Sequence, residues 1–133
     1  MIFVDTSAWY AFADPSDSHH ELAVLCGEEG DQSFLTTDFI VDETLTLLKA
    51  RGLTHRAVSM GEAFFGGNLT RIHYLTVEDI LDAWRVFRDY SDKDWSFTDA
   101  TSKVVIEKLG IRQAFAFDEH FLQFGSVEIV PAG

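Results

Sequence analysis

The sequence predicts an α/β protein, a single domain spanning residues 1–133 with a central, mostly parallel β-sheet flanked by α-helices. Three observations support this fold class. Short apolar runs rich in β-forming residues alternate along the chain with stretches whose apolar residues recur at helical spacing. The length of 133 residues suits one domain and is short for two. A hydrophobic content of 47% favours a folded core over disorder.

The first half of the chain opens with a strand. "IFV" at Ile2–Val4 is entirely apolar, as expected of a strand covered on both faces, and "DTS" then supplies helix-start residues for "AWYAFA". The segment "SHHE" at 18–21 fits a capping box before a second helix, "LAVLC", and 33–37 predicts another strand. A helix from about 38 to 51 follows and ends at Gly52.

The second half repeats this alternation. A helix through "HRAVSMGEAFF" ends at "GGN", and "RIHYL" predicts a strand. Residues 76–90 form an amphipathic helix with Thr76 as its cap, and Asp99 starts a further helix that ends at Gly110. "AFAF" predicts a strand that stops at Asp118, and "VEIV" predicts a last one. Alternating strands and helices indicate a parallel sheet with right-handed crossovers.

The charge balance limits how the chain could bind nucleic acid. It holds 22 acidic and 10 basic residues, a net charge of −12, and none of the basic residues precedes Lys49. Such a surface repels phosphate, so binding driven only by a basic face is disfavoured. Carboxylates that recruit a divalent cation could still engage a phosphodiester. Lys49, Arg51 and Arg56 form a basic group that could contact phosphate, although such residues more often solvate a helix end.

The chain shows no sign of export or of a membrane anchor. Cys26 is the single cysteine, which excludes an intrachain disulfide and a zinc site built from cysteines, and it indicates a reducing compartment. The start lacks the basic region of a signal peptide, and no run approaches the roughly 18 apolar residues of a membrane span. We expect a cytoplasmic protein that is not bound to a membrane.

Two carboxylates follow apolar strands directly. Asp5 comes after "IFV" and Asp118 after "AFAF". In an open parallel sheet, ligands bind beyond the carboxyl ends of the strands, near the point where strand order reverses. We therefore expect Asp5 and Asp118 to share one rim of the sheet.

Glu43 is the unexpected acid of the helix at 38–51. At about 100° per residue it lies between Phe39 and Leu47, beside the apolar stripe of that helix, whereas Asp42 points away. A carboxylate flanked by apolar side chains is costly unless it is paired or bound to a cation.

Asp99 lies in the first turn of its helix among several hydroxyl side chains. Capping explains one such acid, but it does not explain why four acids, Asp5, Glu43, Asp99 and Asp118, all occupy strand ends, a helix start or the edge of an apolar face. Mg²⁺ and Mn²⁺ are hard cations that prefer carboxylates and water. The pattern therefore indicates a site for one of these metals, and without metal the acids would raise each other's pKa values.

Each acid also has an ordinary structural interpretation. Asp5 and Asp99 could be helix caps, because turns from strand to helix favour Asp. Glu43 could be a solvated acid, and Glu119 could replace Asp118 in its role. On the residues alone these alternatives stay open.

The five histidines do not strengthen the case for a metal site. His19 and His20 are adjacent and cannot share a helix face. The other three, His55, His73 and His120, are isolated in the sequence, so we expect ordinary surface or core roles for all five.

Four motifs occur in an order and at a spacing typical of one family. They are "VDTSAW", "DETLTLL", "DWSFTDA" and "AFDEHF", and together they extend over nearly the whole chain. In this ordered set the sequence resembles the PIN-domain family of metal-dependent ribonucleases, and within it the VapC-type toxins of prokaryotic toxin–antitoxin pairs. The resemblance implies a single PIN-like domain.

The resemblance also implies an activity and the residues responsible for it. Asp5, Glu43, Asp99 and Asp118 match the acids that hold one or two Mg²⁺ or Mn²⁺ ions for hydrolysis of RNA phosphodiester bonds. Asp118, which matches the most variable of these acids, could bind metal directly or through water, or could orient the attacking water. The positions that match supporting residues of such a site are Thr6, Ser7, Asp94, Ser96 and Thr98.

The partners implied by the resemblance are RNA, a second copy of the chain in a homodimer, and a small cognate antitoxin protein that wraps the toxin. Transfer, ribosomal and messenger RNA are all open as the target. Two other functions were compared with this one. A haloacid-dehalogenase-like phosphatase would need a second acid two residues after Asp5, where this chain has Ser7. A non-enzymatic module could instead use its acidic pocket to accept a basic residue of a partner.

Overall fold

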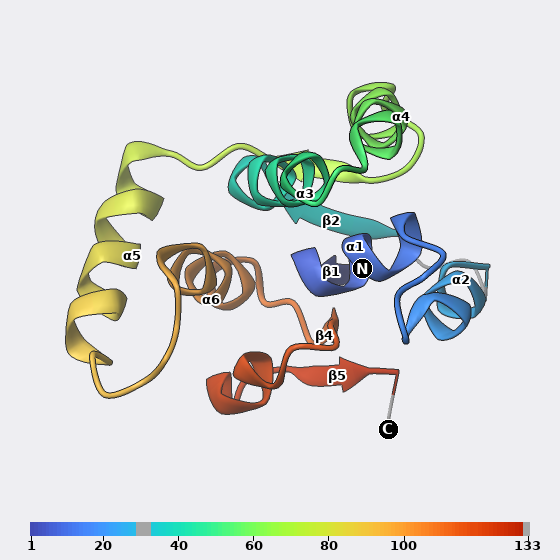
Figure 1. Cartoon of the computed structure of the whole chain (residues 1–133). Coiled ribbons are helices and arrows are strands. Elements are labelled where there is room, and N and C mark those ends of the chain that lie inside the picture. Colours follow the sequence, from blue (N-terminus) through green and yellow to red (C-terminus); the bar gives the residue numbers. More distant parts are fainter. Residues whose placement is uncertain (29–32, 132–133) are drawn as a thin grey trace.

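The structure, a computed structural model, describes residues 1–28 and 33–131 as an α/β fold around a five-stranded sheet (Figure 1). The strands lie in the order β3-β2-β1-β4-β5, and all four neighbouring pairs are parallel. The predicted fold class is therefore confirmed. The strand bounds are β1 (Ile2–Val4), β2 (Phe34–Thr37), β3 (Arg71–His73), β4 (Gln113–Phe115) and β5 (Glu128–Val130).

The central strand β1 marks the point where strand order reverses. Phe3 of β1 lies opposite Leu35 of β2 on one side and Ala114 of β4 on the other. All three residues of β1 are buried, as expected of a strand covered on both faces. The carboxyl end of β1 thus opens into the crevice where parallel sheets of this kind bind ligands.

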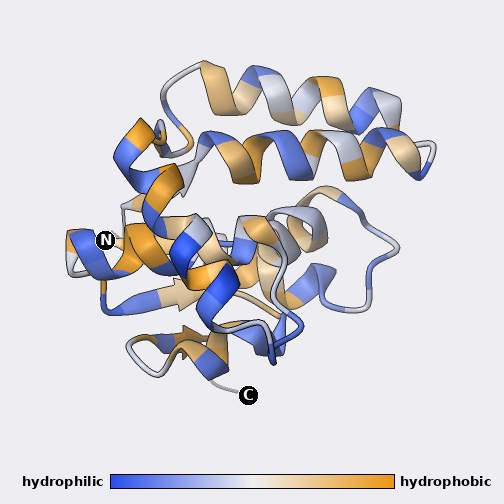
Figure 2. Ribbon diagram, turned by 90° about the vertical axis from the view of Figure 1, so that its left-hand side faces the viewer, coloured by the Kyte–Doolittle hydropathy of each residue, from blue (hydrophilic) through white to orange (hydrophobic). Residues whose placement is uncertain are grey.

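The helices pack as pairs around the sheet. In Figure 1, α3 and α4 lie together at the top, α5 lies against α6 at the left, and α1 lies against α2 at the right. Hydrophilic and hydrophobic bands alternate along the two long helices at the top of Figure 2, as in helices with one buried face. The bounds are α1 (Thr6–Ala13), α2 (His20–Glu28), α3 (Asp38–Ala50), α4 (Thr54–Phe65), α5 (Val77–Asp89), α6 (Phe97–Leu109) and a short 3₁₀ helix, η1 (Glu119–Phe124).

Aromatic side chains join the helices to the sheet in the core. The ring of Trp9 on α1 meets Phe64 of α4 edge-on, with ring centroids 5.1 Å apart, and its indole N–H donates to Oγ1 of Thr36 in β2 at 3.2 Å. Phe3 and Phe121 are fully buried beside each other. Each such ring contributes roughly 1.5–3 kcal/mol by leaving water, so the core holds β1 and its neighbours in a fixed position.

Several predicted boundaries were wrong by one or two residues, among them the end of β3, which lies at His73 rather than at Leu75. Helix α6 begins at Phe97 rather than Asp99, because Ser96 is its N-cap. Helix α2 begins at His20, one residue later than a cap at Ser18 would place it. Strand β4 ends at Phe115 rather than at 117. The Ala116 N–H still donates to the Val130 carbonyl, but the N–H groups of Phe117 and Asp118 bond to the Ser7 hydroxyl instead of to a strand.

No helix within residues 1–28 and 33–131 is long and apolar enough to cross a bilayer.

Candidate active site

Asp5 directly follows strand β1 and is the N-cap of α1. Its backbone is extended, and its Oδ2 accepts hydrogen bonds from the Ser7 backbone N–H at 3.2 Å and from the Ser7 hydroxyl at 2.8 Å. The cap predicted from the sequence is therefore present. The side chain is buried nonetheless, with the residue 4% exposed.

Ser7 fastens the loop after β4 to the start of α1. Its Oγ accepts the backbone N–H groups of Phe117 at 2.9 Å and of Asp118 at 3.2 Å. This contact ends strand β4 and holds Asp118 near Asp5, although the two acids are far apart in the sequence. The expectation that they share one rim of the sheet agrees with this arrangement.

Glu43 lies in the middle of α3, above the same rim. It is half-buried, whereas Asp42 is exposed, as the helical geometry predicts. Burial raises the pKa of the Glu43 carboxyl, and the charges of Asp99 and Asp118 raise it further. Glu43 therefore belongs electrostatically to the same group as the other acids.

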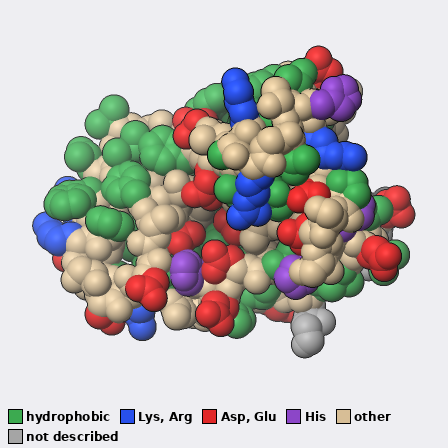
Figure 3. Space-filling view, in the orientation of Figure 1, with side chains coloured by type: hydrophobic (Ala, Val, Ile, Leu, Met, Phe, Trp, Pro, Cys, Tyr) green, Lys and Arg blue, Asp and Glu red, His purple; other side chains and the backbone are tan. Residues whose placement is uncertain are grey.

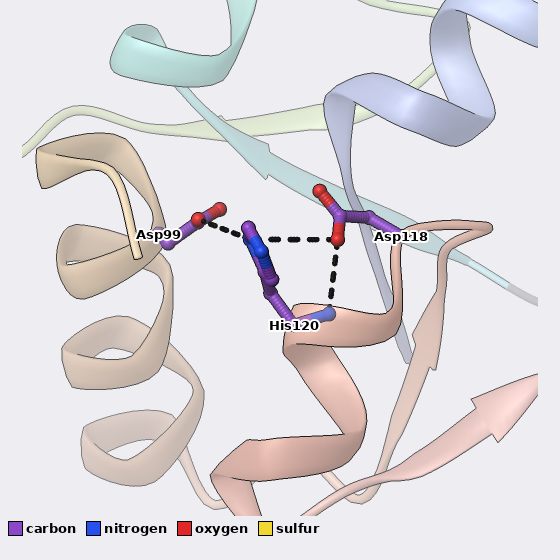
Figure 4. Close-up of side chains that lie close together, drawn as sticks. All are labelled: Asp99, Asp118 and His120. Atoms are coloured by element: carbon purple, nitrogen blue, oxygen red, sulfur yellow. Dashed lines mark hydrogen bonds and ion pairs between the residues drawn. The ribbon is translucent and has the colours of Figure 1, made fainter. Parts of the chain in front are cut away.

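Asp99 contacts both the start of its own helix and another residue of the pocket. It forms a capping box with Ser96: the Ser96 N–H donates to Asp99 Oδ2 and the Asp99 N–H donates to Ser96 Oγ, both at 3.0 Å. The same Oδ2 lies 2.9 Å from Nδ1 of His120 (Figure 4). Asp99 thus takes part in the cap, as the N3 partner of the N-cap Ser96 rather than as the N-cap itself, and this does not exclude a second role.

His120 is the site residue that the sequence analysis missed. Figure 4 shows its ring between Asp99 of α6 and Asp118, with Nδ1 also 3.4 Å from Asp118 Oδ1. Burial lowers the pKa of His120, but the bond to Asp99 and the charges of Asp118, Asp99 and Asp94 outweigh it and raise the pKa overall. The His120 backbone N–H donates to Asp118 Oδ1 at 2.9 Å, so the Asp-x-His spacing in a capped turn was the available signal.

These side chains line one pocket of about 760 Å³. Figure 3 shows acidic side chains gathered in the middle of this face, with histidines and basic side chains near them. The pocket contains all four acids predicted as ligands and four of the five predicted supporting residues. Thr98 is outside it, and its backbone carbonyl accepts the Thr101 hydroxyl at 2.6 Å. The lining residues are Asp5, Thr6, Ser7, Glu43, Leu47, Asp94, Ser96, Asp99, Asp118 and His120.

The electrostatics of the pocket favour a bound cation. Burial raises the pKa of Asp5 to about 7, against the lowering effect of its bonds to Ser7, and the charges of Asp99 and Glu43 add to the rise. No lysine or arginine is among the residues that line the pocket. His120 can offset part of the charge of Asp99 and Asp118, but four carboxylates beside one histidine are costly unless a metal or further protons compensate their charge.

The donor atoms present fit a hard divalent metal. Asp99, Asp118 and His120 each offer a ligand atom, and these atoms lie within 4.8 Å of one another. The buried hydroxyl of Thr6 also faces this pocket, where its interaction with Glu43 lowers the pKa of that carboxyl against the effect of burial. Carboxylate, hydroxyl and water oxygens are the ligands that Mg²⁺ and Mn²⁺ prefer.

Comparison with known proteins decides the family. Residues 2–126 match the family model described as the PIN domain. The chain belongs to the PIN-domain family. Two relatives by sequence place it among the VapC-type members. The 23S rRNA-specific endonuclease VapC20 of Mycobacterium tuberculosis is 35% identical over 131 residues, 98% of this chain and 99% of that protein. A VapC ribonuclease of Archaeoglobus fulgidus is 34% identical over 123 residues, 89% of this chain and 77% of that protein.

Solved structures agree with the sequence comparison. The crystal structure of Mycobacterium tuberculosis VapC20, described as a sarcin–ricin loop cleaving toxin, has a TM-score of 0.91 at 33% identity and covers 98% of this VapC-type chain and 100% of its own. FitAcB of Neisseria gonorrhoeae has a TM-score of 0.63 at 12% identity, covers 97% of this chain and 96% of its own, and shares the fold. The predicted resemblance to VapC-type PIN proteins is confirmed.

Proposed function

We propose that this VapC-type protein is a divalent-metal-dependent endoribonuclease and the toxin of a toxin–antitoxin pair. The observation that carries the proposal is the convergence of four carboxylates, Asp5, Glu43, Asp99 and Asp118, on one pocket at the switch point of the sheet. Its relatives, one of them nearly equal in length, are named for RNA cleavage.

The four acids are proposed to hold Mg²⁺ or Mn²⁺, with His120 as a nitrogen donor beside Asp99 and Asp118. When bound, such a metal helps to generate hydroxide from water and stabilises the charge that develops on the phosphoryl group. The protein contributes by holding the carboxylates in position. Ser96 holds Asp99 and Ser7 holds the loop that carries Asp118, so the carboxylates are kept in place before metal or RNA arrives.

The alternatives are less well supported by the pocket. Ser7 occupies the position where a haloacid-dehalogenase-like phosphatase needs its second acid, and its hydroxyl is engaged in three hydrogen bonds. A purely binding module remains a defined competitor, since an acidic pocket could accept a basic side chain of a partner. It differs in requiring no metal and in cleaving no RNA.

The substrate and partners are proposed from the relatives and the family. We propose 23S ribosomal RNA as the first substrate to test, because the relative that covers nearly the whole chain is named for it. We also propose a homodimer, a small cognate antitoxin protein with a basic residue that reaches the acids, and action in the cytoplasm, where ribosomes are found.

The decisive experiment incubates purified protein with ribosomes and with total RNA, in Mg²⁺, in Mn²⁺ and in chelator. Discrete fragments that need metal and are absent with Asp99→Asn support the proposal. Folded, antitoxin-free protein that yields no metal-dependent fragments from either substrate contradicts it and favours the binding module. Primer extension across 23S rRNA then tests whether the cut lies in the ribosomal substrate.

A further inference from the structure

A second hollow opens beside the acidic pocket. Its volume of about 680 Å³ is close to that of the acidic pocket. The two hollows share Ser7, Leu47 and Asp118 among their lining residues. They are therefore adjacent, and a chain molecule bound at the acids has the second hollow beside it.

Arg51 gives the second hollow a positive charge. It follows α3 as its C-cap, and its guanidinium carbon lies 4.7 Å from the centre of the Tyr10 ring. The Tyr10 hydroxyl donates to Asp14 Oδ2 at 2.8 Å, which holds the ring in place under the guanidinium. In the described part of the chain Arg51 forms no salt bridge with a carboxylate, although its interaction with Tyr10 and the charges of Asp14 and Asp17 raise its pKa. It is the only lysine or arginine among the described residues that line either hollow.

An aromatic stack stands in the same hollow. The rings of His19 and Phe117 are nearly parallel, 11° apart, with centroids at 4.4 Å. The His19 side chain is 51% exposed, so Phe117 leaves part of it open to solvent. Asp17 fixes the turn that carries it, because its Oδ1 accepts the His19 backbone N–H at 2.8 Å. The His19 ring is thus held in place by Phe117 and by its turn, and its exposed part is available for stacking with another ring.

We propose that the second hollow binds the nucleotide adjacent to the scissile phosphodiester, with its phosphate on Arg51 and its base stacked on His19. This inference rests on the proposed ribonuclease function of the acidic pocket. A guanidinium matches phosphate with paired donors, and a base stacks on an aromatic ring whatever its identity. On a chain with a net charge of −12, Arg51 offers the nearest attraction for the strand that the acids repel.

The arrangement also determines the form of RNA that fits. A base can reach the His19 ring only when it has left its own stack, so the adjacent nucleotide must be unpaired or turned out of a helix. The hollow therefore selects single-stranded or looped RNA over a regular duplex, with little preference for which base is present.

Binding is measured without cleavage, in an Asp99→Asn background. The probe is a fluorescein-labelled single-stranded RNA of about ten nucleotides, comparable to known single-strand binding sites, followed by fluorescence anisotropy at constant salt. Arg51→Ala is compared with Arg112→Ala, which removes the same charge just before β4, at the opposite end of the sheet from the acids. His19→Ala is compared with His19→Phe, which keeps a ring.

We expect Arg51→Ala to raise the dissociation constant about tenfold and Arg112→Ala to change it less than about twofold. His19→Ala should raise it about fivefold or more, His19→Phe should restore it, and a blunt RNA duplex should bind with no dependence on His19. If Arg51→Ala unfolds the protein, as judged by circular dichroism, Arg51→Lys and Arg51→Gln replace it, because both keep an aliphatic stem near Tyr10.

Equal losses in Arg51→Ala and Arg112→Ala overturn the proposal, since they show attraction by net charge alone. Unchanged binding in His19→Ala overturns it as well. These outcomes are separate from failure of the ribonuclease function, which shows as intact RNA in the cleavage assay with the unsubstituted protein. A protein that cleaves RNA but binds it without Arg51 and His19 keeps its function and lacks this subsite.

Discussion

Asp99 uses one carboxyl oxygen for two contacts. Its Oδ2 accepts the Ser96 N–H at 3.0 Å and lies 2.9 Å from His120 Nδ1. Asparagine keeps an oxygen that can accept the same hydrogen bonds but lacks the negative charge. The cap and the proposed metal-binding role of Asp99 can therefore be separated by substitution.

We expect Asp99→Asn to abolish RNA cleavage while leaving the thermal midpoint unchanged or higher, because the cap is kept and acid repulsion is relieved. Ser96→Ala should lose about 1 kcal/mol of stability with the cap hydroxyl, and it should reduce cleavage less than Asp99→Asn does, because the Ser96 backbone N–H still donates to Asp99. Cleavage assays and calorimetry on both variants check this. Loss of stability in Asp99→Asn would show that its carboxylate is mainly structural.

Asp5 makes the stability of the metal-free protein depend on pH. Its folded pKa of about 7 lies above the ordinary value of 3.8, so between these values the folded state holds a proton that the unfolded state has lost. Stability therefore falls as pH rises from about 4 to about 7, by an amount on the order of 4 kcal/mol for a shift of this size. His120, with its raised pKa, adds to the loss from about pH 6.5 upward.

We expect Asp5→Asn to remove the larger part of this pH dependence in chelator and to raise the midpoint of urea unfolding at pH 8. His120→Gln is the matched control, because it removes only the part of the pH dependence of stability that appears above about pH 6.5. Urea unfolding at a series of pH values measures both. An Asp5→Asn curve that parallels the unsubstituted protein would contradict the raised pKa.

At the scale of the elements, a buried acid joins β3, α5 and α6 away from the pocket. Asp79 is 4% exposed, and it contacts His73 Nε2 at 2.9 Å, the Thr76 N–H at 3.0 Å and Lys108 Nζ at 2.9 Å. Burial alone would raise its pKa, but these donors hold the pKa of Asp79 well below its usual range. The network positions α6, which carries Asp99.

We expect Asp79→Ala to cost about 3 kcal/mol, the low end for breaking a buried pair, because Lys108 is partly exposed. The contribution of Asp79 is present above about pH 4 and is lost as the pH falls below that value, since its folded pKa is depressed. Asp89→Ala, which removes an exposed ion pair with Arg88 on the same helix, should leave stability unchanged. Chemical denaturation of both variants provides the test.

At the scale of the whole molecule, the acidic charge and the proposed metal are linked. Four carboxylates in one pocket make the folded state costly without a cation, so a bound metal should stabilise the fold. Metal binding should therefore change the thermal stability of the protein as well as its activity.

We expect Mg²⁺ or Mn²⁺ at about 100 times its dissociation constant to add about 2.7 kcal/mol, a rise of several degrees in the thermal midpoint. Asp99→Asn should reduce the rise, and Thr98→Ala should leave it intact because Thr98 is outside the pocket. Differential scanning fluorimetry with metal and with chelator measures this. An equal rise in Asp99→Asn would place the metal elsewhere.

The sequence by itself determined the order of strands and helices, and from it the parallel sheet. Apolar strands, helix caps and glycine stops are local signals, so the elements could be predicted to within one or two residues. The rule that parallel strands end at one edge then placed Asp5 and Asp118 together. Helical periodicity separated Glu43 from Asp42 in the same way.

Only the tertiary structure decided which residues outside these rules join the site. The Ser7 hydroxyl bonds to Asp118 across 111 positions of sequence, and His120 meets Asp99 across 21. The meeting of Arg51, His19 and Phe117 in one hollow depends on packing in the same way. Periodicity and capping are properties of neighbouring residues, whereas these contacts depend on how the elements pack, and packing is a property of the whole core.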